Sequence, residues 1–252
     1  MTLHMRHAPG ARMTTCSYGL SRLQFRGPRR PTDGGYVACL GGSATFARDV
    51  AQPFPDLLEQ ETGMVCLNLG QHLAGPDLFL RDDALRALVH DASAVVIQVM
   101  GAANLGNRFY KVHPRRNDRF IAPRGPLRRL YPEVDFTEIA FTGHLMARLA
   151  ETDRTRLTEV QRELRGCWVR RMRELVGLAN VPVHLLWFAP RQPEDPAGEA
   201  RDPCLVTPGM LDAVGTRLTK VVYDSGPDLR ANVPGPEDHR RAAVALGRAM
   251  GA

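Results

Sequence analysis

The chain has 252 residues, of which 44% are hydrophobic and 24% charged, with a net charge of +6. This composition is typical of a soluble globular protein of one large domain, or of a domain with a tail. The longest apolar run, around residues 92–100, is far shorter than the ~20 residues of a membrane helix. Residues 1–13 lack the apolar core of a secretory signal. We therefore expect a cytoplasmic protein with no membrane partner.

The cysteines and the basic residues give no sign of a metal or of nucleic acid. The five cysteines are scattered without a CxxC pair, so we expect buried reduced thiols and no metal site. The basic residues are almost all arginine, since Lys111 and Lys220 are the only lysines. No nucleic-acid-binding fingerprint accompanies them, so we expect no nucleic-acid partner. Nothing in the sequence calls for a cofactor.

The sequence divides into an arm and a domain. Residues 1–35 are rich in Arg, Gly and Pro and have no sustained period, which predicts an arm packed loosely over the rest. Within it, residues 18–25 could add a short edge strand before the RGPRRP stretch breaks the chain. Residues 36–252 are predicted to form a single domain, with a basic insertion at about 105–132.

From residue 36 onward, short apolar runs alternate with amphipathic segments. Continuous apolar runs are typical of buried parallel strands, and apolar residues spaced by three and four are typical of helices. Strands are predicted over 36–40, 64–69, 94–100, 181–188 and 220–223. Helices are predicted over 53–61, 77–90, 135–150, 153–179, 210–218 and 236–250. The alternation predicts an α/β fold with a three-layer, doubly wound, mostly parallel sheet of about five strands.

Three of the predicted strands run into chemically distinctive residues. The first ends in two glycines and Ser43, the second in Gly70, and the third in Gly101 with Asn104 three residues later. In an open parallel sheet these strand ends share one edge, where ligands bind. A serine close to backbone and amide N–H donors is what acyl transfer needs to stabilise an oxyanion.

In these three blocks the chain resembles the SGNH (GDSL-like) hydrolase superfamily. GGSATF matches the first block, NLGQHLAGPD the second in its longer form, and GAAN the third. The resemblance implies the SGNH/flavodoxin-like fold and a serine hydrolase. It implies that Ser43 is the nucleophile, and that the Gly70 N–H and the Asn104 side chain hold the oxyanion. No GxxxxGK[ST] or GxGxxG pattern supports a nucleotide-binding turn instead.

The fourth block of the superfamily, Asp-x-x-His, is missing. The alignment puts His239 on the second, structural histidine of the family, and it puts Val233 and Arg230 where the catalytic pair belongs. A serine without a base is a poor nucleophile at neutral pH. Two histidines remain candidates for the base: His239, whose position also suits a core residue, and His72 in the second-block loop.

The basic insertion suggests an alternative function. Arginine clusters bind carboxylate, phosphate or sulfate through their planar forks. If the insertion lies at the ligand edge, it could recognise an anion, and a solvated basic loop is the other reading. The ligand-binding candidates are Gly42, Arg108, His113, Arg115, Arg116 and Arg119.

Two functions therefore stay open. One is an SGNH-like esterase acting on an O-acyl group of an acidic or sugar-type small molecule. The other is a catalytically impaired SGNH-fold protein that binds an anionic ligand or partner through the insertion. The chain also resembles an uncharacterised bacterial family of unknown function, through the stretches FRGP, LGGSATF, QVMGAAN, HPRRNDRF and YPEVDFTE. That second resemblance implies no chemistry.

Overall fold

The fold is built on a parallel sheet of five strands. The computed structural model describes residues 13–196, 203–223 and 233–251. The strands lie in the order β4-β3-β5-β8-β9, and every neighbouring pair is parallel. Their bounds are β3 Tyr36–Leu40, β4 Val65–Asn68, β5 Ala94–Gln98, β8 Val183–Ala189 and β9 Arg217–Val222. Placing the first strand between the second and third is the doubly wound order, so the predicted fold class is confirmed.

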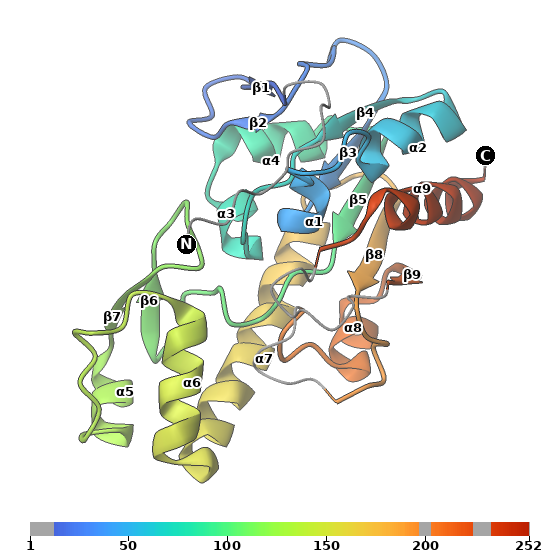
Figure 1. Cartoon of the computed structure of the whole chain (residues 1–252). Helices are drawn as coiled ribbons and strands as arrows, with labels where there is room; N and C mark the ends of the chain where they lie inside the picture. Colours follow the sequence, from blue (N-terminus) through green and yellow to red (C-terminus); the bar gives the residue numbers. More distant parts are fainter. Residues whose placement is uncertain (1–12, 197–202, 224–232, 252) are drawn as a thin grey trace, which may run out of the picture.

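Helices cover both faces of the sheet (Figure 1). One face packs against α2 Phe54–Thr62 and α9 Pro236–Met250, which share a core with alternate residues of the central strands. The other face carries α3 Pro76–Leu80, α4 Asp83–His90, α7 Arg154–Val176 and α8 Pro208–Val214. The central strands are buried on both sides, which explains their continuously apolar sequences.

Three of the predicted helices have different boundaries in the structure. The helix predicted over 210–218 ends at Val214, because Gly215 has a left-handed backbone with φ of 76° and β9 begins at Arg217. The segment 77–90 is broken into α3 and α4, because the Asp82 side chain accepts the Leu85 N–H and caps a new helix start. The helix predicted from residue 135 begins only at Thr142, as α6 Thr142–Thr152. Asp135 instead accepts hydrogen bonds from the N–H and the hydroxyl of Thr137, so local polar turns replace the first helical turns.

The described part of the N-terminal arm, residues 13–35, is packed more tightly than expected. Its strands β1 Thr15–Cys16 and β2 Phe25–Arg26 pair with each other as a separate antiparallel ribbon, not as an edge of the main sheet. Tyr18 and Phe25 are buried in the main core. The buried Arg26 guanidinium donates to the carbonyls of Phe46, Ala47, Val50 and Ala51, which immediately follow the Ser43 turn.

The insertion has structure of its own. It contains the hairpin β6 Tyr110–Val112 and β7 Phe120–Pro123 and the short helix α5 Gly125–Leu130. These elements project from the carboxyl edge of the sheet and lie near α6 and the first turns of α7 (Figure 1). Its aromatic side chains Phe109, Tyr110 and Phe120 are buried. Within the described ranges, no helix has the length and apolarity to cross a membrane.

Candidate active site

Ser43 is held in a tight turn between β3 and the one-turn helix α1 Ser43–Phe46. The side chain of Gln98, at the end of β5, fixes this turn. Its Oε1 accepts the Gly42 N–H at 3.0 Å, the Thr45 N–H at 3.2 Å and the Thr45 hydroxyl at 2.8 Å. A Cβ on Gly41 would come within 2.6 Å of that oxygen, so the turn needs glycine there. Gly42, predicted to bind ligand, instead helps to anchor the serine.

Gly70 does not present a free donor. Its N–H donates to the Asn68 side-chain oxygen at 3.1 Å, and the Asn68 amide donates to the Thr45 carbonyl at 2.8 Å. A Cβ on Gly70 would lie 2.3 Å from the Phe46 nitrogen. Gly70, predicted to hold the oxyanion, thus allows close packing against α1, and in this structure its N–H is bonded to Asn68.

His72 is the histidine that meets Ser43. The distance from Ser43 Oγ to His72 Nδ1 is 2.9 Å, and the Leu73 N–H donates to the same Oγ at 3.1 Å. When the serine hydroxyl donates to Nδ1, the neutral ring carries its proton on Nε2. Leu73 adopts a left-handed backbone with φ of 51°, which is uncommon for a branched residue and turns its N–H toward the serine.

The surroundings of His72 favour its neutral form. Desolvation lowers the pKa of the His72 ring, the guanidinium groups of Arg48 and Arg116 lower it further, and the Asp118 carboxylate opposes them. A neutral imidazole is the form that can accept a proton from serine. A lowered pKa extends this form to more acidic pH.

His239, the other candidate base, is a core residue. It is fully buried, and its Nδ1 accepts the Phe54 N–H at 3.0 Å. Its ring stacks on Phe54 and meets Phe188 edge-on. Burial lowers the pKa of His239 to about 4. The predicted catalytic role is corrected, because both the contacts and the charge state of this ring serve the packing of α9 against α2.

Asn104 lies beside the same loop, with its amide fixed at both ends. Its Oδ1 accepts the Thr142 hydroxyl at 2.6 Å, and its Nδ2 donates to the Leu73 carbonyl at 3.1 Å. Leu73 thus contacts Ser43 through its N–H and Asn104 through its carbonyl. The Thr142 contact sets the orientation of the amide, since its hydroxyl donates to the oxygen and leaves the nitrogen to donate to the Leu73 carbonyl.

For the ester hydrolysis that the three sequence blocks predict, we expect Thr142→Val to lower kcat about tenfold with little change in KM, because the amide loses the bond that aims its N–H groups. Thr142→Ser keeps the hydroxyl and is expected to restore the rate. Steady-state kinetics of the two variants check this. A valine variant as active as wild type would contradict the role given to Thr142.

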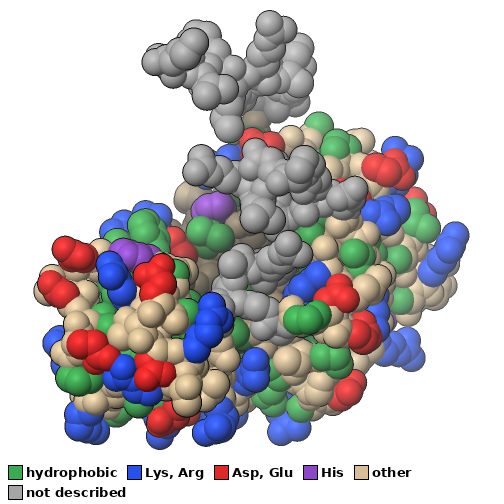
Figure 2. All heavy atoms as spheres, turned by 60° about the horizontal axis from the view of Figure 1, so that its bottom comes forward, with side chains coloured by type: hydrophobic (Ala, Val, Ile, Leu, Met, Phe, Trp, Pro, Cys, Tyr) green, Lys and Arg blue, Asp and Glu red, His purple; other side chains and the backbone are tan. Residues whose placement is uncertain are grey.

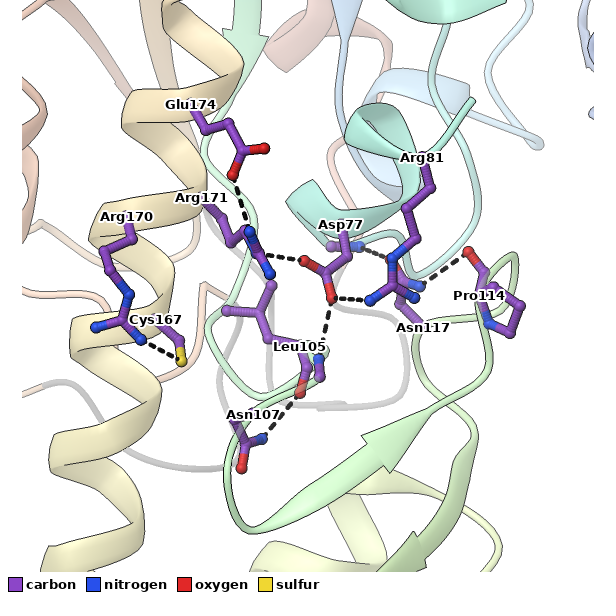
Figure 3. Close-up of polar contacts among 12 residues, drawn as sticks. Asp77, Arg81, Leu105, Asn107, Pro114, Asn117, Cys167, Arg170, Arg171 and Glu174 are labelled. Carbon is purple, nitrogen blue, oxygen red and sulfur yellow. Dashed lines mark hydrogen bonds and ion pairs between the residues drawn. The ribbon is translucent and has the colours of Figure 1, made fainter. Parts of the chain in front are cut away.

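The loop that carries Asn104 is anchored below the site by Asp77, which is 1% exposed. Its carboxylate accepts the Gly106 N–H at 3.1 Å and binds Arg81 and Arg171, each at 3.0 Å. Figure 3 shows this carboxylate between the two guanidinium groups, joining α3, the loop and α7. A buried carboxylate with two cationic partners is costly to disturb, so the loop is held firmly.

The arginines of the insertion do not converge on one point. Arg108 binds Glu159 at 2.7 Å and lies over the ring of Phe109, while Arg119 lies over Phe141. His113 Nδ1 accepts the N–H groups of Arg115 and Arg116, so this histidine closes a turn. On the face shown in Figure 2, basic and acidic side chains are interspersed. Of the arginines predicted to bind an anion, Arg108 is paired with Glu159, whereas Arg116 is one of the charges that act on His72.

Several residues of the site were not predicted. Gln98 and Asn68 could have been found from the sequence, because each is a polar residue at the end of an apolar strand. Arg48, Asp118 and Thr142 give no such signal, because only the fold brings them near His72 or Asn104. Of the expected fourth block, Val233 is 57% exposed and Arg230 lies outside the described residues.

Metal ligands are not grouped in the described part of the chain, where no three His, Cys, Asp or Glu side chains could hold an ion. Cys39, Cys66 and Cys167 are buried free thiols, as expected.

The chain matches one family model and is similar to several solved structures. The model described as "Domain of unknown function (DUF6473)" matches residues 1–250. No curated protein matches. A carbohydrate esterase family 2 enzyme from Corynascus thermopiles (Myceliophthora fergusii) is 13% identical, with a TM-score of 0.46 over 89% of this chain and 68% of that one.

Two further structures are similar at the same level. An alpha/beta hydrolase enzyme from the metagenome of Lake Arreo, Spain, is 14% identical, with a TM-score of 0.48 over 86% of this chain and 95% of that one. A putative lipolytic protein of the G-D-S-L family from Desulfitobacterium hafniense is 14% identical, with a TM-score of 0.40 over 85% and 99%. The fold assignment rests on the strand order of the chain itself.

Proposed function

Because the chain belongs to the family described as a domain of unknown function (DUF6473), which states no activity, we propose its function from the site. The protein is a serine esterase of the SGNH type in which Ser43 is the nucleophile and His72 is the base. The observation that carries this proposal is the 2.9 Å contact between Ser43 Oγ and His72 Nδ1. His72 thereby takes the place of the histidine base that the missing fourth block contains in the superfamily.

The reaction follows from these contacts. As Ser43 Oγ bonds to the ester carbon, its proton passes to His72 Nδ1. The oxyanion accepts hydrogen bonds from Asn104 Nδ2 and from the Ser43 N–H. To donate to the oxyanion, Asn104 Nδ2 releases the Leu73 carbonyl. The tetrahedral species collapses, the alkoxide leaves with the proton from His72, and an acyl-Ser43 ester remains. Water, deprotonated by His72, then attacks that ester, and the carboxylic acid departs as Ser43 regains its proton.

The charges near the base support an anionic substrate. Arg48 and Arg116 both act on the His72 ring, and both side chains are exposed to solvent. Among the described residues, the ion-pair partner of the Arg116 guanidinium is Asp118, at 4.0 Å. A carboxylate or phosphate on the substrate would pair with these guanidinium groups. We therefore propose an O-acyl ester that carries an acidic group.

Hydrolysis of two matched esters tests this function. We expect Ser43-dependent release of p-nitrophenol from both p-nitrophenyl acetate and mono-p-nitrophenyl succinate. The kcat/KM for the succinate should be about tenfold higher at low salt, and the advantage should shrink as salt screens the arginines. Arg48→Gln should remove that advantage, while Arg128→Gln on α5 should keep it. Absence of Ser43-dependent turnover of either ester would overturn the proposal.

A further inference from the structure

The side chain of Asn117 joins the insertion to the loop over residues 70–75, the His72 loop. Asn117 is fully buried, and its Oδ1 accepts the Gly75 N–H at 3.0 Å. Its Nδ2 donates to the carbonyls of His113 at 3.0 Å and of Pro114 at 3.4 Å. Figure 3 shows this amide directed at the Pro114 carbonyl. One side chain therefore closes a turn of the insertion and bonds the end of the His72 loop.

The His72 loop meets the loop that carries Asn104 at the same place. A Cβ on Gly75 would lie 2.2 Å from the Asn104 carbonyl oxygen, so the two backbones are in contact here. The residue after Asn117 is tied to Asn104 as well. The Asp118 carbonyl accepts the Thr142 N–H at 2.9 Å, and the Thr142 hydroxyl donates to Asn104 Oδ1. The turn of the insertion is thus bonded to both loops of the site.

The His72 loop is held at both ends and strained in between. At its start the Gln71 N–H donates to the Gly41 carbonyl at 3.0 Å, and at its end Asn117 accepts the Gly75 N–H. Between these bonds lies Leu73, with its left-handed backbone. The cost of that conformation for a branched side chain is of the order of one hydrogen bond, so it persists only where the surroundings enforce it. The bond to Asn117 is one of the contacts that enforce it.

We propose that Asn117 is a positioning residue for the reaction of Ser43, because it holds the His72 loop in the conformation that places His72 Nδ1 and the Leu73 N–H on the serine oxygen. This inference rests on the proposed function. Asn117 bonds backbone groups, so it acts through His72 and Leu73.

Without the bond from Asn117, the backbone at Leu73 relaxes toward a right-handed or extended conformation, and the imidazole of His72 leaves its 2.9 Å contact with Ser43. Proton transfer needs that contact, whereas substrate binding does not, so kcat falls more than KM rises. The insertion thereby contributes to the reaction through geometry.

Two substitutions of Asn117 separate this role from a general loss of stability. Asn117→Ser leaves a hydroxyl that can bond the His113 carbonyl within the turn but is too short to reach Gly75. It is expected to speed hydrogen exchange of the Leu73 amide about tenfold and to lower kcat for p-nitrophenyl acetate about tenfold to a hundredfold, with KM little changed. Asn117→Asp keeps an oxygen for the Gly75 N–H and should keep both quantities within about threefold of wild type.

Tyr131→Phe is the control, since it frees the same insertion at another attachment. The Tyr131 hydroxyl donates to the Asp153 carbonyl at 2.8 Å, and its removal should change neither the exchange of Leu73 nor kcat. NMR measures the exchange on the folded protein without substrate, and urea unfolding measures the stability of each variant.

The outcomes separate the two proposals. Unchanged exchange of Leu73 in Asn117→Ser overturns the role of Asn117, whether or not the wild type hydrolyses esters. Faster exchange beside an unchanged kcat also overturns it, since the reaction then does not need the loop to be fixed. Losses of kcat that merely follow the loss of stability across the three variants contradict it too. If the wild type lacks Ser43-dependent hydrolysis, the esterase proposal falls, and the exchange rates still decide whether Asn117 holds the loop.

Discussion

His72→Ala is expected to reduce kcat for ester hydrolysis about 10³-fold while the protein stays folded. General-base catalysis contributes about 10²–10⁴-fold, and His72 is the histidine in contact with Ser43 among the residues that the structure describes. His72 is exposed, so its loss removes little packing. Initial rates with p-nitrophenyl acetate, together with a thermal melt of the same sample, measure both effects.

The control is His144→Ala, an exposed histidine on α6, which should keep wild-type kinetics. The double variant Ser43→Ala/His72→Ala should be no slower than Ser43→Ala alone, because the two groups act as a unit. A His72→Ala enzyme that retained wild-type kcat would remove His72 from the mechanism.

His239→Ala is expected to lose stability rather than activity, with a decrease of about 3 kcal/mol in the free energy of unfolding. Truncating this fully buried ring opens a cavity between Phe54 and Phe188 and leaves the Phe54 N–H without its acceptor. Urea unfolding measures the loss. At a temperature where the variant is folded, kcat should stay near the wild-type value, and a specific loss of kcat without a loss of stability would contradict the structural role.

The same histidine predicts a pH dependence of stability. Its folded-state pKa, about 4, lies below the ordinary value of 6.5, so the unfolded chain binds the proton more readily. The contribution is complete above about pH 6.5 and is lost as the pH falls toward 4, by about 3 kcal/mol in total. His239→Ala should flatten this part of the stability curve.

The sheet could be predicted from sequence because each central strand is a continuous apolar run that ends in glycine or a polar residue. The helix break at Asp82 could not be predicted, because the helical spacing of apolar residues continues across Asp82. The helix is interrupted only because the Asp82 side chain caps the start of α4. The loose packing predicted for the arm is wrong for residues 13–35 for a related reason. The RGPRRP stretch indicates only a break in regular structure, whereas the burial of Arg26 depends on four carbonyl oxygens whose positions a sequence does not give.

Some residues of the site could likewise be predicted from the sequence, and others could not. Ser43 and Asn104 were proposed from strand ends, whose shared edge follows from parallel topology. The sequence leaves His72 and His239 as candidate partners of Ser43, and the structure shows His72 in contact with it. Charges from Arg48 and Asp118 reach His72 only through tertiary contacts. The sequence therefore locates the serine, and the structure identifies the histidine beside it.

Covalent labelling with a fluorophosphonate, mapped by peptide mass spectrometry, tests the central claim most directly. A reactive serine with a base forms a stable phosphonyl ester at Oγ. The Ser43–His72 pair predicts a single adduct on the peptide containing Ser43, abolished in Ser43→Ala and strongly slowed in His72→Ala. A folded wild-type protein that acquires no adduct, or one that labels at the same rate without His72, would contradict it.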